Sequence, residues 1–362
     1  MKRIVLTGGG SAGHVNPALA IADAVRAEFG ADAEFLYIGA LGKLEQKLVP
    51  KAGYKFVPLN IAGGLRRSVN PRDIAYNARA LAKNQAAVGT AKRILRDFKP
   101  DIVIGTGGYV CYPVLRAAYG LKLKSLLYEC NVYPGLTVKS LANGADGILL
   151  GFEEARKYFS EKNQSKLTVT GIPVRKEFAE ARADAESSGK PLLVSFWGSL
   201  GAKHMNTVLL DFIRLNEERG RFRHIHATGE HHYEAFEERL PKRLAYTEVV
   251  RYIDDMAAKL QASSLAICRA GASTLNELAV LGKPAVLVPS PYVAENHQEI
   301  NARAIESRGN AIVLREKDCT AEALFEAAEK ALGLNPAPDR EILGATERIL
   351  SVIREQISNI KY

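Results

Sequence analysis

Four glycine-containing loops are the segments of this sequence best suited to ligand chemistry. Each follows a short apolar run typical of a strand and precedes a segment with helical periodicity. They cover residues 8–13 (GGGSAG), 105–109 (GTGGY), 197–202 (WGSLGA) and 269–274 (RAGAST). Glycine lets the backbone approach a ligand closely, and amides at the start of a helix attract phosphate. The loops therefore predict a phosphate-bearing ligand; the alternative for each is a tight turn that binds nothing.

The first loop also has the GxGxxG spacing of dinucleotide-binding enzymes. A dinucleotide site needs an acidic residue about 20 residues further on, at the end of the second strand, to hold the ribose hydroxyls. The second strand expected here ends at residues 37–40 (YIGA), and Glu34 comes before that end. This disfavours a dehydrogenase, and the pairing of the loops at 8–13 and 105–109 favours a ligand with a pyrophosphate group.

His14 is a candidate general base, because it follows the first loop and precedes Pro17, a residue suited to the first turn of a helix. The positive end of a helix favours a neutral imidazole, which can accept a proton. Glu129 is the rival base, and the simpler alternative for His14 is that it caps the turn. The simpler alternative for Thr274 and Glu277 is a capping box at the start of a helix.

Strand-like and helix-like segments alternate along the whole chain, which is typical of βαβ units. The predicted fold class is α/β, with two Rossmann-like parallel-sheet domains that face each other across a cleft. Proline ends regular structure, so Ile172-Pro173-Val174 is the expected hinge. The predicted parts are a domain at 1–170, a linker at 171–190, a second domain at 191–340 and a final helix at 341–362. Strands are expected at 2–7, 34–38, 55–59, 101–104, 124–128, 147–150, 167–170, 191–195, 224–227, 248–252, 265–268, 285–288 and 311–314.

Composition narrows the class of protein. The chain has 362 residues, of which 47% are hydrophobic, and its four cysteines are far apart, so disulfides and structural zinc are not expected. With no signal-peptide core and no long apolar stretch, we expect a protein that is neither secreted nor membrane-spanning. The net charge of +9 calls for an anionic partner, and residues 61–100 hold nine basic residues against two acidic ones. Nucleic acid is not the expected partner, because that segment has only Tyr76 and Phe98 as aromatics and no binding motif is present.

Six blocks in one order give the chain a specific resemblance. It resembles the peptidoglycan N-acetylglucosaminyltransferases, which are family 28 glycosyltransferases with the two-domain GT-B fold. The blocks are residues 8–17 (GGGSAGHVNP), 105–113 (GTGGYVCYP), 129–135 (ECNVYPG), 171–175 (GIPVR), 198–202 (GSLGA) and 269–301 (RAGASTLNELAVLGKPAVLVPSPYVAENHQEIN).

The resemblance implies a role for each matched residue. UDP-N-acetylglucosamine is expected to bind Ser11, Gly13, Asn131, Arg175, Ser199, Thr274, Glu277, His297 and Gln298, with Glu277 on the ribose and Asn301 nearby. The acceptor is expected to bind Gly13, Tyr109 and Asn131, with His14 and Glu129 as the catalytic pair. Four residues depart from the usual family pattern and leave the sugar contacts less defined: Trp197, Cys130, Ile172 and His297.

The implied reaction is an inverting transfer of N-acetylglucosamine to a polyprenyl-pyrophosphate-linked muramoyl-pentapeptide, giving the β-1,4-linked disaccharide of peptidoglycan synthesis. No metal and no other cofactor is required by that scheme. The lipid acceptor implies a peripheral enzyme on the cytoplasmic face of the cell membrane, docked on an anionic membrane surface through residues 61–100. The alternatives are another GT-B glycolipid glycosyltransferase and a UDP-N-acetylglucosamine 2-epimerase.

Overall fold

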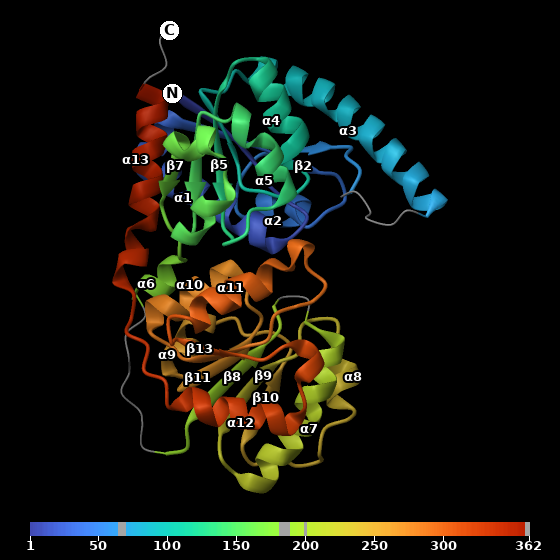
Figure 1. The fold of residues 1–362 in the computed structure, drawn as a ribbon, viewed down its shortest axis with the longest axis vertical. Helices are drawn as coiled ribbons and strands as arrows, with labels where there is room; N and C mark the ends of the chain where they lie inside the picture. The colour runs from blue at the N-terminus through green and yellow to red at the C-terminus, as the bar shows by residue number, and fades with distance from the viewer. Residues whose placement is uncertain (64–69, 181–188, 199–200, 359–362) are drawn as a thin grey trace. The chain divides into compact units, whose positions relative to one another are not determined.

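The computed structural model describes residues 1–63, 70–180, 189–198 and 201–358. The chain divides into two compact units, one formed by Met1–Pro173 together with Gly344–Tyr362 and the other by Val174–Leu343. Each unit has its own parallel sheet with helices on both faces (Figure 1). The expected α/β fold is therefore confirmed.

The sheet of the first unit has seven parallel strands in the order β3-β2-β1-β4-β5-β6-β7. The strands are β1 Lys2–Thr7, β2 Ala33–Ala40, β3 Phe56–Leu59, β4 Ile102–Gly105, β5 Lys124–Glu129, β6 Gly147–Leu150 and β7 Leu167–Val169. The helices are α1 Ala12–Phe29, α2 Glu45–Lys51, α3 Pro71–Phe98, α4 Cys111–Gly120, α5 Leu136–Leu141 and α13 Ala345–Ser358. Because the strand order reverses beside β1, the loops after β1, β4 and β5 meet at one edge, where ligands bind in such sheets.

The register brings the first two glycine loops together. Thr7 at the end of β1 pairs with Gly105 at the end of β4, and Gly105 pairs with Leu127 of β5. The central strands are buried on both faces, as their apolar sequences predict. Three neighbouring strand ends thus deliver their loops to the same place.

Helix α3 is buried along only part of its length. Asn70 caps it by accepting a hydrogen bond from the Arg72 amide at 3.0 Å, and Pro71 occupies the first turn. Its buried residues are Ala80, Ala87, Ala91 and Leu95, and its N-terminal half extends away from the sheet in Figure 1.

Helix α13, the last helix, packs on the first unit. Its apolar face is buried, Arg354 pairs with Glu28 of α1 at 2.7 Å, and the Arg348 Nε donates to the Thr170 carbonyl at 2.9 Å. The chain therefore returns to the first unit after completing the second.

The sheet of the second unit has six parallel strands in the order β10-β9-β8-β11-β12-β13. The strands are β8 Leu192–Phe196, β9 Arg223–Ala227, β10 Thr247–Val250, β11 Leu265–Cys268, β12 Ala285–Leu287 and β13 Ala311–Val313. The helices are α6 Lys176–Glu180, α7 Lys203–Arg219, α8 Tyr233–Glu237, α9 Met256–Ala262, α10 Ala272–Leu281, α11 His297–Glu306 and α12 Ala321–Leu332. Two apolar cores lie on the two faces of this sheet, one under α7 and α12 and the other under α9, α10 and α11.

Candidate active site

The His14 ring is fixed by the loop after β4. Its Nδ1 lies 3.1 Å from the Thr106 carbonyl oxygen, and the Thr106 hydroxyl donates to the His14 carbonyl at 2.7 Å. A carbonyl oxygen can only accept, so Nδ1 carries a proton, and in the neutral ring the lone pair is on Nε2. Helix α1 begins at Ala12 with Ser11 at its cap position, so His14 lies inside the first turn and is not the cap.

The first two loops need glycine in order to pack on each other. A Cβ at Gly108, whose φ is +79°, would lie 2.1 Å from the Gly9 carbonyl oxygen. A Cβ at Gly107, whose φ is +98°, would lie 2.7 Å from Nδ1 of His14. Positive φ angles and these contacts together exclude other residues. Gly107 and Gly108 thus allow the two loops to pack closely, and this packing positions the His14 ring.

Tyr109 and Ser11 lie at the same edge of the sheet. The Tyr109 ring would come within 2.9 Å of a Cβ at Gly10, and partial burial raises the pKa of its hydroxyl. Ser11 is exposed, and its side chain makes no capping hydrogen bond to α1. Gly13 is exposed in the first turn of the helix, and its carbonyl lies 3.6 Å from the Cys130 sulfur.

Glu129 organises the loop after β5. It is almost fully buried, and its Oε1 accepts from the backbone amide of Asn131 at 2.9 Å and from the Asn131 side chain at 3.0 Å. Its Oε2 accepts from the Gly135 amide at 2.9 Å. Burial raises the pKa of Glu129 although these hydrogen bonds oppose the shift. Both carboxylate oxygens are therefore used within residues 129–135.

Arg175 and Glu277 form a pair in the second unit. The Nε and Nη2 of Arg175 both lie 3.1 Å from Oε1 of Glu277, and Nη1 lies 3.2 Å from Glu177. Burial raises the pKa of Glu277, and the charge of Arg175 works against that rise. Helix α10 begins after Gly271, which places Thr274 and Glu277 inside the helix. The capping-box alternative is therefore wrong.

Gln298 and His297 begin helix α11, which follows an unusual turn. Glu295 and Asn296 have φ angles of 55° and 50°, a left-handed conformation that is uncommon outside glycine. The Gln298 Oε1 accepts from the Ser290 amide at 2.9 Å, so its amide NH₂ is the group suited to meet a sugar hydroxyl.

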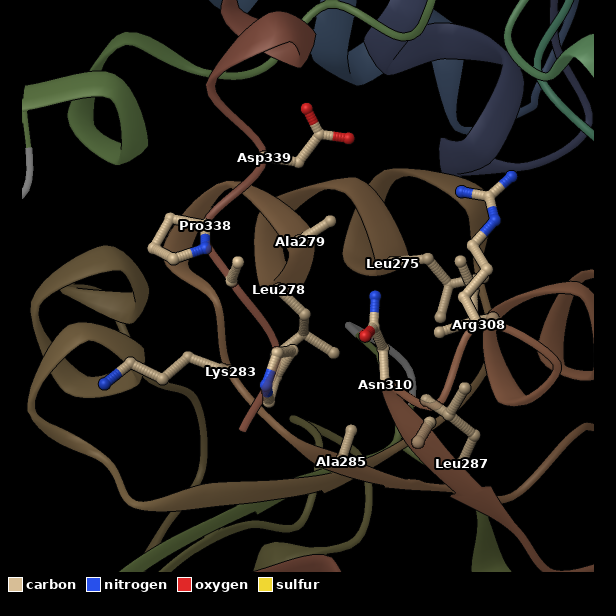
Figure 2. A pocket seen from close by; sticks show the side chains of 14 residues that line it. Leu275, Leu278, Ala279, Lys283, Ala285, Leu287, Arg308, Asn310, Pro338 and Asp339 are labelled. Carbon is tan, nitrogen blue, oxygen red and sulfur yellow. The ribbon is translucent and has the colours of Figure 1, made fainter. Parts of the chain in front are cut away.

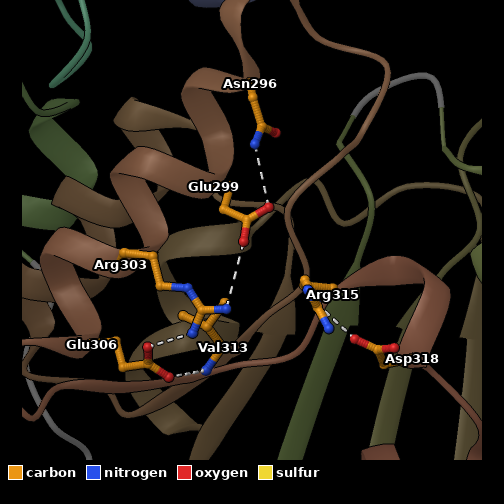
Figure 3. Close-up of polar contacts among 7 residues, drawn as sticks. All are labelled: Asn296, Glu299, Arg303, Glu306, Val313, Arg315 and Asp318. Atoms are coloured by element: carbon orange, nitrogen blue, oxygen red, sulfur yellow. Dashed lines mark hydrogen bonds and ion pairs between the residues drawn. The ribbon is translucent and has the colours of Figure 1, made fainter.

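Helix α11 is anchored behind this turn by a ladder of polar contacts (Figure 3). Arg303 lies 3.5 Å from Glu299 and 2.7 Å from Glu306, and Glu306 also accepts from the Val313 amide of β13 at 2.9 Å. Asn301 is fully buried, with its side chain 3.5 Å from the Ala270 carbonyl. Ser199 lies outside the described residues, while Gly201 beside it requires glycine because a Cβ would lie 2.2 Å from the Thr228 carbonyl oxygen.

A separate cavity of about 340 Å³ lies beside α10 (Figure 2). Leu275, Leu278 and Ala279 line it from that helix, and Pro338 and Asp339 line it from the segment after α12. Glu277 is not among its lining residues. The cavity is therefore distinct from the predicted donor-binding residues.

Sequence reasoning missed Glu45, the first residue of α2. It is fully buried, and it accepts hydrogen bonds from the amides of Ala40 and Gly10 at 3.1 and 3.3 Å. Glu45 lies five residues after Ala40, the last residue of β2, and its two oxygens are used by backbone amides of the protein. The signal in the sequence was a single acidic residue between Glu34 and Asp73, and its partners are the amides of Ala40 and Gly10.

Comparison with known proteins matches both units to one family. Residues 4–150 match the glycosyltransferase family 28 N-terminal domain and residues 192–345 match the glycosyltransferase family 28 C-terminal domain. The chain is 37% identical over 372 residues, covering 99% of both chains, to the UDP-N-acetylglucosamine--N-acetylmuramyl-(pentapeptide) pyrophosphoryl-undecaprenol N-acetylglucosamine transferase of Acetivibrio thermocellus. It is 39% identical over 335 residues, covering 92% of this chain and 91% of the other, to the protein of the same name from Lactococcus lactis.

A solved structure shares the fold. The crystal structure of Acinetobacter baumannii MurG superposes with a TM-score of 0.75 at 24% identity, over 98% of this chain and 100% of that one. The family expected from the six sequence blocks is confirmed. The chain belongs to the family 28 glycosyltransferases, among the UDP-N-acetylglucosamine--N-acetylmuramyl-(pentapeptide) pyrophosphoryl-undecaprenol N-acetylglucosamine transferases.

Proposed function

We propose that this chain transfers N-acetylglucosamine from UDP-N-acetylglucosamine to undecaprenyl-pyrophosphoryl-N-acetylmuramoyl-pentapeptide. The names of its full-length relatives support this substrate pair. The product is the β-1,4-linked disaccharide on the same lipid, formed with inversion at the sugar carbon. The single observation that carries the chemistry is the orientation of His14, whose Nδ1 is held by Thr106.

His14 acts as the general base in this proposal. Its Nε2 takes the proton of the acceptor hydroxyl while the hydroxyl oxygen forms a bond to the sugar carbon. The bond from that carbon to the UDP oxygen breaks, and UDP leaves with the electron pair. Glu129 is the weaker candidate, because both its oxygens already accept hydrogen bonds from its own loop. We assign it to positioning Asn131, which with Gly13 and Tyr109 is proposed to contact the acceptor.

The second unit is proposed to hold most of the donor. Glu277 accepts from the ribose hydroxyls, for which its Oε2 is suited because Arg175 engages Oε1. Amides at the start of α10, together with Thr274 and Ser199, meet the diphosphate. Arg175 adds charge for the leaving UDP, and the remaining contacts are proposed for Ser11, Gly13, Asn131, His297 and Gln298.

We further propose peripheral docking on the cytoplasmic face of the membrane, through the N-terminal half of α3. Ile74 and Leu81 are 56% and 57% exposed there, and three exposed cations accompany them, namely Arg72, Arg79 and Lys83. In the C-terminal half of the same helix, Ile94 and Leu95 pack in the core. The alternative is that α3 is a helix whose cations are solvated and whose aliphatic side chains are all in the core. That description agrees with the C-terminal half of α3 and not with its N-terminal half. Arg66 and Arg67 of the basic segment lie outside the described residues.

Apolar side chains beside cations suit the membrane interface, and each cation near an anionic surface contributes about 1 kcal/mol. Among the described residues, no helix has both the length and the apolar character needed to cross a bilayer.

The test of the proposed function is mass spectrometry of the purified protein with UDP-N-acetylglucosamine and a short-chain analogue of the lipid acceptor. The expected product is the acceptor with one added N-acetylhexosamine. Consumption of the donor without acceptor, with release of UDP, would favour the epimerase alternative. No product with this acceptor but transfer to another glycolipid would favour the other GT-B alternative.

A further inference from the structure

Glu45 is a buried carboxylate directly beneath the loop that leads to His14. None of its surface is exposed, and its two oxygens accept from two different backbone amides. Oε1 takes the Ala40 amide at the end of β2, and Oε2 takes the Gly10 amide in the loop after β1. Placing a carboxylate out of water is costly unless hydrogen bonds compensate it. The two backbone amides supply this compensation for Glu45.

The glycines around Glu45 are shaped to its side chain. A Cβ at Gly9 would lie 2.3, 2.6 and 3.0 Å from Oε1, Cδ and Oε2 of Glu45, the three nearest atoms. A Cβ at Gly39 would lie 2.5 Å from Cε2 of Phe56 and 2.8 Å from Cγ of Glu45, so this glycine makes room for both side chains. Gly9 does not have the positive φ of its neighbour Gly10, and a methyl group at Gly9 would displace the carboxylate of Glu45.

The loop is held at its other side as well. The Tyr37 hydroxyl donates to the Gly8 carbonyl at 2.8 Å, and the Gly9 amide lies 3.4 Å from the Gly107 carbonyl. Tyr37 of β2 and Glu45 of α2 thus hold residues 8–10 through two hydrogen bonds, and the Gly107 carbonyl of the loop after β4 accepts from the Gly9 amide. Helix α1 starts two residues later and carries His14 in its first turn.

We propose that Glu45 is a positioning residue for sugar transfer: it turns the Gly10 amide inward and holds the glycine loop where His14 can reach the acceptor hydroxyl. This inference rests on the proposed function, because it acts through the proposed base. It also means that the Gly10 amide is used by the protein and does not serve a phosphate. A displacement of about 1 Å in such a group lowers turnover by about 100-fold.

The first experiment compares Glu45→Gln with wild type in the short-chain transfer assay. The amide side chain keeps the volume but sets an NH₂ group against one of the two backbone amides, so the loop shifts. We expect kcat to fall by about 10- to 100-fold, the size of effect that a displacement of about 1 Å in a catalytic group produces. The KM for UDP-N-acetylglucosamine should not change. Gln46→Ala is the control at the neighbouring position, because the Gln46 Oε1 accepts from the amide of Gly42, which lies outside the glycine loop.

The second experiment is a double-mutant cycle with Gly9→Ala and Glu45→Ala. Gly9→Ala should lower kcat because its methyl group displaces the carboxylate, and it should cost little more once Glu45→Ala has removed that carboxylate. Additive losses would overturn the inference, and so would an unchanged kcat in Glu45→Gln. A loss of kcat matched by an equal loss in the number of UDP-binding sites per protein would also overturn it, because that pattern shows that part of the variant protein is unfolded. Absence of transfer by the wild-type protein is a different result, which would refute the proposed function itself.

Discussion

The buried pair His224 and His226 should make the second unit acid-sensitive. The Ser195 hydroxyl lies 2.7 Å from Nε2 of His224 and 2.7 Å from Nδ1 of His226, and both rings are fully enclosed. Among the described residues, the second ring nitrogens, Nδ1 of His224 and Nε2 of His226, have no hydrogen-bond partner. Burial lowers the pKa of His226 to about 3, and burial together with the nearby His226 lowers that of His224 well below its usual value.

The sign of the effect follows from proton linkage. Below about pH 6.5 the unfolded chain protonates these histidines and the folded chain does not, so the unfolded state binds more protons and stability falls as pH falls. For one histidine that stays neutral in the fold, the loss between about pH 7.5 and about pH 5 is about 2 kcal/mol, and for both it is about 4 kcal/mol. This loss continues down to the folded pKa values.

Urea unfolding followed by tryptophan fluorescence measures this directly, because Trp197 is the single tryptophan of the chain and is buried in the second unit. The variant His226→Gln removes one titrating ring, so its free energy of unfolding should fall by about 2 kcal/mol less than that of wild type over the same pH range. His204→Gln, which changes an exposed histidine on α7, is the matched control and should follow wild type. Equal pH dependence in wild type and His226→Gln would refute the reasoning.

Three further predictions concern substrates and membrane. His14→Ala should lower kcat by about 100- to 10,000-fold as expected for loss of a general base, whereas Glu129→Gln should retain more turnover; the reverse order in folded proteins would make Glu129 the base. Glu277→Ala should weaken UDP binding by calorimetry in a variant whose thermal melt shows that it is folded, and unchanged affinity would remove Glu277 from the donor site. Sedimentation with anionic vesicles should fall when three cations in the N-terminal half of α3 are changed to glutamine. The matched control changes Lys92, Arg93 and Arg96 in the C-terminal half to glutamine and should sediment like wild type. Equal binding by both variants would exclude the N-terminal half as the docking surface. The residues of the first set are Arg72, Arg79 and Lys83.

Strand positions were predictable because buried parallel strands are short apolar runs between glycine turns. β1 Lys2–Thr7, β6 Gly147–Leu150 and β11 Leu265–Cys268 have the bounds that their sequences predict, and the other described strands differ by one or two residues at one or both ends. The meeting of the loops at 8–13 and 105–109 also follows from the pattern, since a parallel sheet collects its strand ends at one edge.

Contacts between distant side chains were not predictable in the same way. The burial of Glu45 against Gly10, the pairing of Arg175 with Glu277 and the docking of α13 on α1 are tertiary contacts that leave no periodic trace in the sequence. The glycines of the first two loops were expected to admit a ligand. At Gly107 and Gly108 the structure gives them a different role, the packing of one loop on the other.

The most direct test of the central claim is the transfer assay with UDP-N-acetylglucosamine and the short-chain lipid acceptor, read by the linkage of the product. The proposal predicts a single disaccharide product in which nuclear magnetic resonance shows a β-1,4 linkage, formed by wild type and lost to a large extent in folded His14→Ala. An α-linked product, or a β-linked product formed equally well by His14→Ala, would contradict inversion with His14 as the base.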